Sequence, residues 1–386
     1  MEEFAMNANI RYIGVNDHDI DLFEGQYTVP NGMAYNSYLI LDEKIAVMDT
    51  VDIRKSGGYF ANLEAALQGR SPDYLIVSHV EPDHASSVKL FTQKYPAAKI
   101  VGNAKTFQFL TNYFDLTGTE CITVKDGDTL DLGQHKLTFI LAPMIHWPEV
   151  MMTYESTEKV LFSADAFGKF GALDVEEDWD CEARRYYFNI VGKFGVQVQT
   201  LLKKAAALDI AAICPLHGPI LTESIPHALA LYQTWSSYSV ETEGVFIAYA
   251  SLYGNTKNAA LHLKDMLEKR GCPKVAVTDL AREDMAEALE DAFRYGKVVL
   301  AASSYNGNVM PFMEDFLHHL KGKNYQKRTI ALVENGTWAP SAAKTMRELL
   351  EGMKDIAILE PVVTIRGALK DSDLPALHQL ADELMK

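Results

Sequence analysis

Two histidines and two carboxylates lie within one stretch of six residues, His79-Val80-Glu81-Pro82-Asp83-His84. The run before it, Tyr74-Leu75-Ile76-Val77, is apolar and predicts a buried strand. Because side chains two residues apart in an extended segment point the same way, we expect His79, Glu81 and Asp83 to converge on one side. Imidazole and carboxylate groups are metal ligands, and four of them at a strand end favour a metal site over a solvated polar loop.

Three later strand-like runs each lead into one further candidate: His146, Asp165 and His217. Taken alone, His146 or Asp165 fits a satisfied polar group of the core equally well, and His217 competes with His227, which lies in an apparent helix. The candidate ligands are His79, Glu81, Asp83, His84, His146, Asp165 and His217. This set exceeds what one tetrahedral ion needs and suits two metals, with Asp165 able to bridge them. Its mixture of imidazoles and carboxylates is compatible with iron, manganese or zinc.

The elements that must position these residues form a strand-rich first half. Residues 38–41 and 45–48 flank a polar Asp42-Glu43-Lys44 and predict a hairpin. Residues 58–67 predict an amphipathic helix, and a second helix is expected to begin near Ala85. Further strands are predicted at 137–141, 151–154, 160–162 and 210–213. Strand runs with few helices between them predict sheet layers flanked by helices, an αββα sandwich.

A second domain is predicted to begin near residue 244, so that the chain divides into 1–243 and 244–386. Residues 225–238 predict a helix, 239–244 a polar linker, and 245–250 an apolar strand typical of a parallel sheet.

That strand runs into Ser251-Leu252-Tyr253-Gly254-Asn255-Thr256-Lys257, and a helix is expected from about Asn258. Strand, polar loop and helix predict a phosphate cradle, with donors from Ser251, Asn255 and Thr256. The alternative is an ordinary helix capped by Asn255 or Thr256. The loop has neither a Walker pattern nor G-x-G-x-x-G, which argues against ATP or a dinucleotide.

Strands at 275–277, 298–301, 329–332 and about 356–359 alternate with helical stretches and predict a doubly wound parallel sheet of the flavodoxin type. Two further loops, Ser303–Asn308 and Glu334–Trp338, fall at its carboxyl edge. Each carries an aromatic residue and small residues, which suits the stacking and wrapping of a planar ring.

Composition excludes several classes of protein. The chain has 386 residues, which suggests at least two domains, and a net charge of −16, which disfavours nucleic acid or an anionic membrane as a partner. No run approaches the roughly 20 apolar residues of a membrane span, and the acidic start Met1-Glu2-Glu3-Phe4 predicts no secretory signal. The four cysteines contain no C-x-x-C pair, which argues against a disulfide framework or a fused rubredoxin-type iron site. We therefore expect a cytoplasmic protein.

The loop H-x-E-x-D-H, with its later histidines and aspartate, resembles the metallo-β-lactamase-like domain of flavodiiron proteins. Glu81 stands where the zinc-binding hydrolases of that superfamily have a second histidine, which points to iron. The segment Asn31–Tyr38 and the triplet His146-Trp147-Pro148 look like the same family, and S-x-x-G-N-T from Ser251 to Thr256 resembles the flavodoxin phosphate loop. The loop 334–338 departs from the family's usual Gly-Tyr-Gly-Trp-Gly.

The resemblance implies a metallo-β-lactamase-like diiron domain followed by a flavodoxin-like FMN domain. His79, Glu81 and His146 would hold one iron, Asp83, His84 and His217 the other, and Asp165 would bridge. Trp147 would form a wall of the gas pocket, although a packed core aromatic is as good an interpretation. The implied FMN contacts are Ser251, Tyr253, Gly254, Asn255, Thr256, Ser303, Ser304, Tyr305, Asn306, Gly307, Asn335, Gly336, Thr337 and Trp338, with Tyr305 and Trp338 beside the isoalloxazine ring.

The same resemblance implies an oxidoreductase that reduces O2 to water, NO to N2O, or both; ligand spacing does not choose between the gases. It further implies a head-to-tail homodimer or a dimer of dimers, and electrons from a separate rubredoxin-like or other reductant. Three alternatives belong to other classes: a zinc hydrolase with a flavodoxin passenger, a plain electron carrier, and a gas sensor without turnover. Glu81 and the flavin module speak against the hydrolase.

Overall fold

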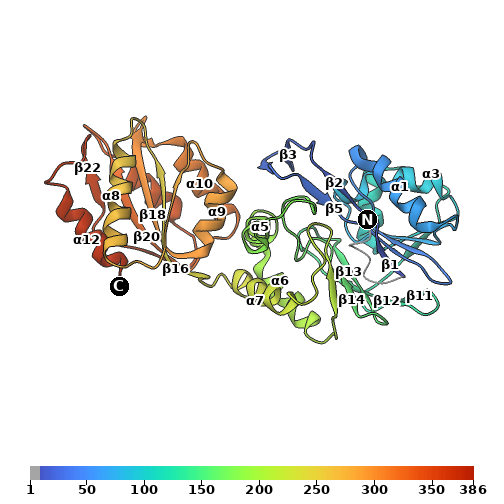
Figure 1. Cartoon of the computed structure of the whole chain (residues 1–386). Coiled ribbons are helices and arrows are strands. Elements are labelled where there is room, and N and C mark those ends of the chain that lie inside the picture. Colours follow the sequence, from blue (N-terminus) through green and yellow to red (C-terminus); the bar gives the residue numbers. More distant parts are fainter. Residues whose placement is uncertain (1–8) are drawn as a thin grey trace. The chain divides into compact units, whose positions relative to one another are not determined.

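The computed structural model describes residues 9–386, so the acidic start Met1–Phe4 lies outside it. The chain forms two compact units (Figure 1). Unit 1 extends to Tyr187 and resumes at Val196–Gln233, whereas unit 2 comprises Phe188–Gly195 and Thr234–Lys386.

Unit 1 contains two facing sheets and two short strand pairs. The first sheet has the order β1 (Ile10–Tyr12), β6 (Tyr38–Ile40), β7 (Ala46–Met48), β8 (Tyr74–Ile76), β9 (Lys99–Gly102), β10 (Cys121–Thr123). The second has the order β11 (Thr129–Asp131), β12 (Lys136–Leu141), β13 (Met151–Glu155), β14 (Val160–Phe162), β15 (Ala212–Cys214). The short pairs are β2 (Val15–Asp17) with β5 (Met33–Tyr35), and β3 (Leu22–Phe23) with β4 (Tyr27–Thr28).

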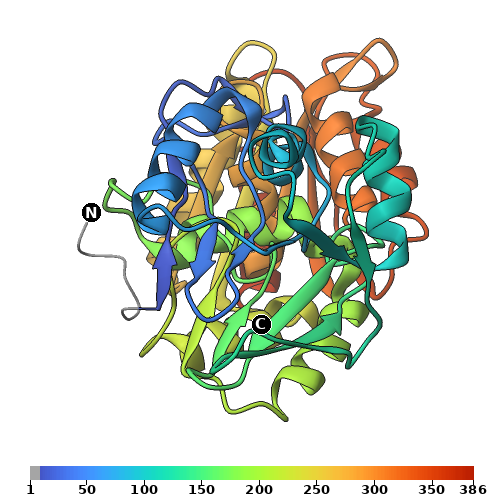
Figure 2. The same ribbon diagram turned by 90° about the vertical axis from the view of Figure 1, so that its right-hand side faces the viewer.

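The core of unit 1 lies between its two sheets. Ile40 and Ile76 of the first sheet and Phe139, Met151 and Val160 of the second belong to one buried apolar cluster. Figure 2 shows these strands between blue-to-teal helices on one side and yellow-green helices on the other. The helices are α1 (Ser56–Leu67), α2 (Pro82–Ala85), α3 (Val88–Lys94), α4 (Ala104–Tyr113), α5 (Trp179–Tyr186), α6 (Gly195–Ala205) and α7 (Ile225–Ser236). The predicted αββα sandwich is confirmed, and the predicted hairpin is the antiparallel pair β6–β7.

The sheet of unit 2 has the parallel order β17 (Val275–Asp279), β16 (Thr242–Ala250), β18 (Tyr295–Tyr305), β20 (Arg328–Asn335), β21 (Ile356–Ile358). Two short strands that the sequence analysis missed, β19 (Asn308–Val309) and β22 (Val363–Ile365), pair with β18 and β20. The helices are α8 (Asn255–Lys269), α9 (Met285–Arg294), α10 (Pro311–Gly322), α11 (Ala342–Leu350) and α12 (Leu374–Leu384). This is the doubly wound flavodoxin-like order predicted from the sequence.

Side-chain alternation divides the helices of unit 2 between the two faces of its sheet. Val245 and Ile247 of β16 share a buried cluster with Leu263 of α8 and Leu380 of α12. Phe246 points to the opposite face, where its ring contacts Phe316 of α10. Burial on both faces explains why β16 reads as a continuous apolar run.

Two predicted boundaries in unit 2 are wrong. Strand β16 begins at Thr242, so the predicted linker 239–244 is partly strand. Helix α8 begins at Asn255, not near Asn258, with Gly254 before it in the left-handed conformation at φ 88°. Its cap residue is therefore Gly254, with no side-chain hydrogen bond, so the alternative of an ordinary helix capped by Asn255 or Thr256 is not supported.

Among residues 9–386, no helix combines the length and the apolar character that crossing a lipid bilayer requires.

Candidate functional site

The seven predicted metal ligands lie together in unit 1 as two adjacent sets. The first set is His79, Glu81, His146 and Asp165. Glu81 Oε2 lies 3.2 Å from His79 Nε2 and 2.9 Å from His146 Nε2. One potential ligand atom from each residue falls within 4.8 Å of all the others, so a single cation could contact the whole set.

The second set is Asp83, His84 and His217. Asp83 Oδ2 lies 3.2 Å from His84 Nε2 and 3.2 Å from His217 Nε2. The two imidazole nitrogens are 3.1 Å apart. Three ligand atoms thus face one another at distances that a shared cation would explain.

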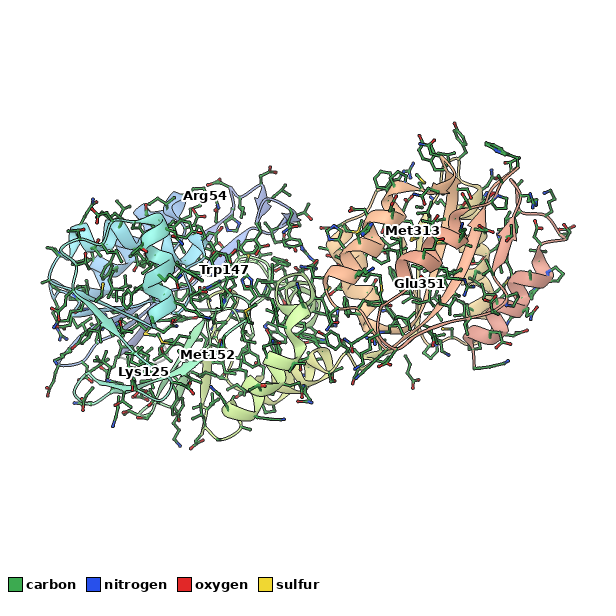
Figure 3. The ribbon with its side chains drawn as sticks, turned by 180° about the vertical axis from the view of Figure 1, so that it is seen from behind. Arg54, Lys125, Trp147, Met152, Met313 and Glu351 are labelled. Atoms are coloured by element: carbon green, nitrogen blue, oxygen red, sulfur yellow. The ribbon has the colours of Figure 1, made fainter. Side chains whose placement is uncertain are left out.

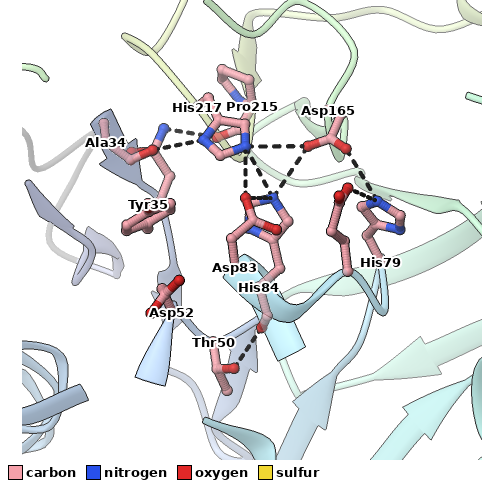
Figure 4. Close-up of polar contacts among 12 residues, drawn as sticks. Ala34, Tyr35, Thr50, Asp52, His79, Asp83, His84, Asp165, Pro215 and His217 are labelled. Atoms are coloured by element: carbon pink, nitrogen blue, oxygen red, sulfur yellow. Dashed lines mark hydrogen bonds and ion pairs between the residues drawn. The ribbon is translucent and has the colours of Figure 1, made fainter. Parts of the chain in front are cut away.

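Asp165 joins the two sets (Figure 4). Its Oδ2 lies 3.3 Å from His79 Nε2 and 3.2 Å from His146 Nε2, whereas its Oδ1 lies 3.3 Å from His84 Nε2. The side chain is 1% exposed. One buried carboxylate therefore presents one oxygen to each set, the arrangement expected of a bridging ligand.

The expectation that His79, Glu81 and Asp83 converge on one side is wrong for Asp83. The chain turns into helix α2 at Pro82, immediately after Glu81, which is still extended at φ −56° and ψ 139°. Proline suits the first helical position because it has no N–H to leave unpaired. The helical turn swings Asp83 away from Glu81 and into the second set with His84.

Hydrogen bonds behind the histidines hold them in place. His217 Nδ1 lies 2.7 Å from the carbonyl oxygen of Ala34, whereas at His84 it is the main-chain carbonyl that is held, by the hydroxyl of Thr50. His79 Nδ1 lies 2.7 Å from Glu149 Oε1. The sequence analysis missed Glu149; its signal was a carboxylate three residues after His146 and two before β13.

The cluster is strongly ionic although it is buried. Burial lowers the pKa of His146, but contacts with Asp165 and Glu81 outweigh it and raise that pKa to about 9. Burial raises the pKa of Asp165, yet the imidazoles around it hold that pKa well below its usual range. The shifts of these two groups have the same cause, the close approach of imidazole and carboxylate, and a bound cation would take the place of a proton there.

The donor set fits two cations. Within the part of the chain that the structure describes, both oxygens of Asp83, Oδ1 of Asp165 and Nε2 of His146 are buried without a hydrogen-bond partner. Buried polar atoms are rarely left in this state. Three of the four, namely Asp83 Oδ2, Asp165 Oδ1 and His146 Nε2, lie within 3.3 Å of another candidate ligand atom, where metal coordination would satisfy them.

Aromatic rings lie beside the cluster. Trp147 of unit 1 (Figure 3) is half-buried, and its ring is edge-on to His79 at 5.2 Å between centroids. The rings of Phe23, Tyr35 and Tyr186 lie 5.4, 6.0 and 5.5 Å from that of His217. Trp147 is thus next to the cluster, as a pocket wall requires, and the other three rings were not predicted.

Unit 2 carries a hollow of about 400 Å³ at the carboxyl edge of its sheet. Its lining comprises Leu252, Tyr253, Asn255, Ser303, Ser304, Tyr305, Asn306, Gly307, Asn335, Gly336, Thr337, Trp338, Ala339 and Gly367. The volume falls in the usual range for small-molecule sites. Tyr253 and Trp338 are each 88% exposed, so two large aromatic faces are available to a planar ring.

Three of the predicted contacts do not line this hollow: Ser251, Gly254 and Thr256. The Oγ of Ser251 accepts hydrogen bonds from the N–H groups of Gly254 and Lys257, at 3.1 and 3.2 Å. Thr256 Oγ1 pairs with Ser303 Oγ at 2.8 Å. These hydroxyls shape the loop from within. Leu252, Ala339 and Gly367 line the hollow but were not predicted.

Comparison with known families assigns a model to each half of the chain. The ODP family beta lactamase model matches residues 33–218, and a flavodoxin domain model matches residues 246–381. These ranges contain the seven candidate ligands and the phosphate-type loop, respectively.

Individual proteins resemble the chain over most of its length. An anaerobic nitric oxide reductase flavorubredoxin of Pectobacterium carotovorum is 30% identical over 89% of this chain and 70% of its own. The flavodiiron protein of Giardia intestinalis is 25% identical, with a TM-score of 0.92 over 99% of this chain and 95% of its own. The rubredoxin oxygen:oxidoreductase of Desulfovibrio gigas is also 25% identical, with a TM-score of 0.91 over 98% and 96%.

Proposed function

This chain belongs to the flavodiiron proteins, and on that premise we propose that it is an oxidoreductase that reduces NO, O2 or both at a pair of iron ions supplied with electrons by FMN. The observation that carries the proposal is the placement of Asp165, one oxygen of which faces each set of ligands. The related proteins support both gases, because one is named a nitric oxide reductase and another an oxygen:oxidoreductase.

In this proposal His79, Glu81 and His146 hold one iron, Asp83, His84 and His217 hold the other, and Asp165 bridges. When bound, the iron pair would bind the gas and transfer electrons to it. Glu81 supports iron over zinc because a carboxylate there makes the first set harder and richer in oxygen.

The protein contributes an aromatic surrounding. Trp147 packs against His79 of the first set, and Phe23, Tyr35 and Tyr186 pack around His217 of the second. O2 and NO are small and weakly polar, so an aromatic wall admits them while it limits water. Burial also strengthens every electrostatic contact in the cluster.

FMN would bind in the hollow of unit 2, with its phosphate at the Ser251–Thr256 loop and its ring beside Tyr305 and Trp338. The start of the 15-residue helix α8 supports the phosphate position, since helix amino termini favour anions. Gly336 supports a tightly fitted third loop, because a Cβ there would approach Pro340 Cα to 2.6 Å.

Replacing Ser251 with Ala is expected to weaken FMN binding roughly 10-fold, which is about 1.4 kcal/mol. The substitution removes the acceptor that holds the N–H groups of Gly254 and Lys257 and so loosens the loop. Titration of the flavin-free protein with FMN, followed by quenching of flavin fluorescence, measures the change. Thr345→Ala is the control, because this hydroxyl only bonds its own helix at Ser341. Equal affinities for S251A and wild type would contradict the proposed phosphate site.

We further propose that the functional division lies near residue 243, since all candidate metal ligands precede it and all flavin loops follow it. A separate rubredoxin-like protein is the proposed electron donor, which the name of the Desulfovibrio protein supports.

A head-to-tail homodimer would bring the flavin of one copy to the irons of another. The exposed faces of Tyr253 and Trp338 support such packing at the mouth of the hollow. Sedimentation of the intact protein tests the oligomer.

Gas consumption by protein loaded with iron and FMN tests the proposed function. The protein is reduced anaerobically by an artificial donor and supplied with O2 or NO in separate runs. Catalytic consumption of either gas supports the proposal, and the ratio of rates gives the preference. Zinc-loaded protein is the control and should consume neither gas. If the iron-loaded protein binds both cofactors yet turns over neither gas, the reductase proposal is wrong.

A further inference from the structure

Glu149 lies directly behind His79, on the side opposite the ligand cluster. Its Oε1 is 2.7 Å from His79 Nδ1, and both side chains are completely buried. The same oxygen accepts the N–H of Val80 at 3.0 Å. Because His79 Nε2 faces Glu81 and Asp165, Nδ1 is left to donate its proton to Glu149.

The position of Glu149 is itself fixed by the fold. Its carbonyl oxygen accepts a hydrogen bond from Asn103 Nδ2, and the Met151 N–H donates to the carbonyl of Ser78 at 2.9 Å. The first bond connects Glu149 to the start of α4, and the second connects the start of β13 to the loop that carries His79. Glu149 therefore orients a histidine from a different loop while His146, three residues earlier, enters the same set.

Among the residues that the structure describes, no carboxylate is hydrogen-bonded behind a histidine of the second set. The Nδ1 of His217 meets the neutral carbonyl oxygen of Ala34 at 2.7 Å. The Nδ1 of His84 is buried and has no hydrogen-bond partner among residues 9–386. The structure thus places a hydrogen-bonded anionic acceptor behind a histidine of the first set. The described residues hydrogen-bond no carboxylate to Nδ1 of either histidine of the second, because the buried Asp49 near His84 accepts the N–H of Ser78 instead.

We propose that Glu149 is a positioning residue that makes the two metal positions unequal, by fixing His79 and by increasing the electron density which this imidazole donates to the first. The inference rests on the proposed iron pair. A charged acceptor strengthens the hydrogen bond from Nδ1 and makes the imidazole a more basic ligand. It should therefore favour the oxidised ion at the first position and increase its affinity.

The test uses Glu149→Gln in the full-length protein. Glutamine retains the shape and one acceptor oxygen but removes the charge. Loss of such an outer partner typically weakens metal affinity about 10–100-fold. We expect a chelator to remove one of the two irons from E149Q at about 10–100-fold lower concentration than from wild type, while the other iron is unchanged. The reduction potential of the site, followed by the EPR signal of its half-reduced form, should rise.

Two further variants separate this role from simple packing. Glu155→Gln removes the charge of a buried carboxylate at the end of β13, which instead accepts the N–H groups of Thr157 and Glu158 in a turn. It should retain the chelation curve and the potential of wild type. Glu149→Asp keeps the charge and should lie closer to wild type than E149Q does.

Wild-type chelation and potential in E149Q, or an equal shift in E149Q and E149D, would overturn the role of the charge. If E149Q yields no folded protein, the reduction potential of E149D is the test. A wild-type potential in E149D supports the inference, and a shifted potential opposes it. Iron content of the wild type is a separate measurement. Fewer than two ions per chain would overturn the metal assignment itself, together with this inference, whereas two ions with unchanged variants would overturn this inference alone.

Discussion

Replacing Asp165 with Asn is expected to leave fewer than two irons per chain and to reduce gas consumption by at least about 100-fold. Losing a residue that only hydrogen-bonds a metal ligand already costs up to about 100-fold, and Asp165 is proposed to be a ligand itself. Asp165 is the residue whose two oxygens face different sets, so its loss affects both positions. Asparagine also has an NH2 group in place of one of the two carboxylate oxygens, next to the imidazole nitrogens. This NH2 group cannot bind a cation. Iron content by elemental analysis and consumption of O2 and NO measure the effect.

The matched control is Asp42→Asn in the same unit. Asp42 is also buried beside a histidine, with its Oδ2 2.8 Å from His135 Nδ1, but it belongs to neither ligand set. This variant should keep both irons and its turnover, even if its stability falls. D165N protein that retains two irons and wild-type turnover would refute the bridging role.

Removal of the metals is expected to lower the melting temperature of unit 1 by about 10 °C. An ion present at 1,000 times its dissociation constant stabilises the folded state by about 4.1 kcal/mol. For a unit of about 200 residues, each kcal/mol corresponds to roughly 2–4 °C. Chelation also removes the cation from the buried carboxylate oxygens of Asp83 and Asp165. Their negative charge is then balanced by contacts with the histidines. Calorimetry of chelated and iron-reloaded protein gives the shift.

FMN release provides the internal control for this experiment. The flavin hollow is built entirely from residues of unit 2, so the temperature at which flavin fluorescence appears should not follow the iron content. Reloading with iron should restore the original transition. An unchanged melting temperature after complete removal of metal would contradict the assignment of the cluster as a tightly held metal site.

The outline of both units could be predicted from local patterns. Apolar runs such as Tyr74–Val77 and Val245–Ala250 indicate strands because β-branched and aromatic residues suit a buried pleated surface. Short strands with few helices predict the sandwich, and alternating strands and helices predict the flavodoxin-like sheet. The ligand list could be predicted as well, because polar side chains after buried strands collect at one edge of a sheet.

The boundaries were less predictable because backbone conformation depends on more than composition. Gly254 adopts φ 88°, so α8 begins directly after it and the hydroxyls of Ser251 and Thr256 turn into the loop. Pro82 begins a helix where an extended segment was equally compatible with the sequence. In both cases one residue sets the direction of several side chains.

The sequence by itself determined the types of candidate ligand, their order along the chain and the succession of two folds, because these depend on residue identity and local periodicity. Only the tertiary structure decided that Asp83 joins His84 and His217, and that Glu149 stands behind His79. The contact between Glu149 and His79 joins residues 70 positions apart. Local propensity contains no information on such a contact, since packing between loops of different strands creates it.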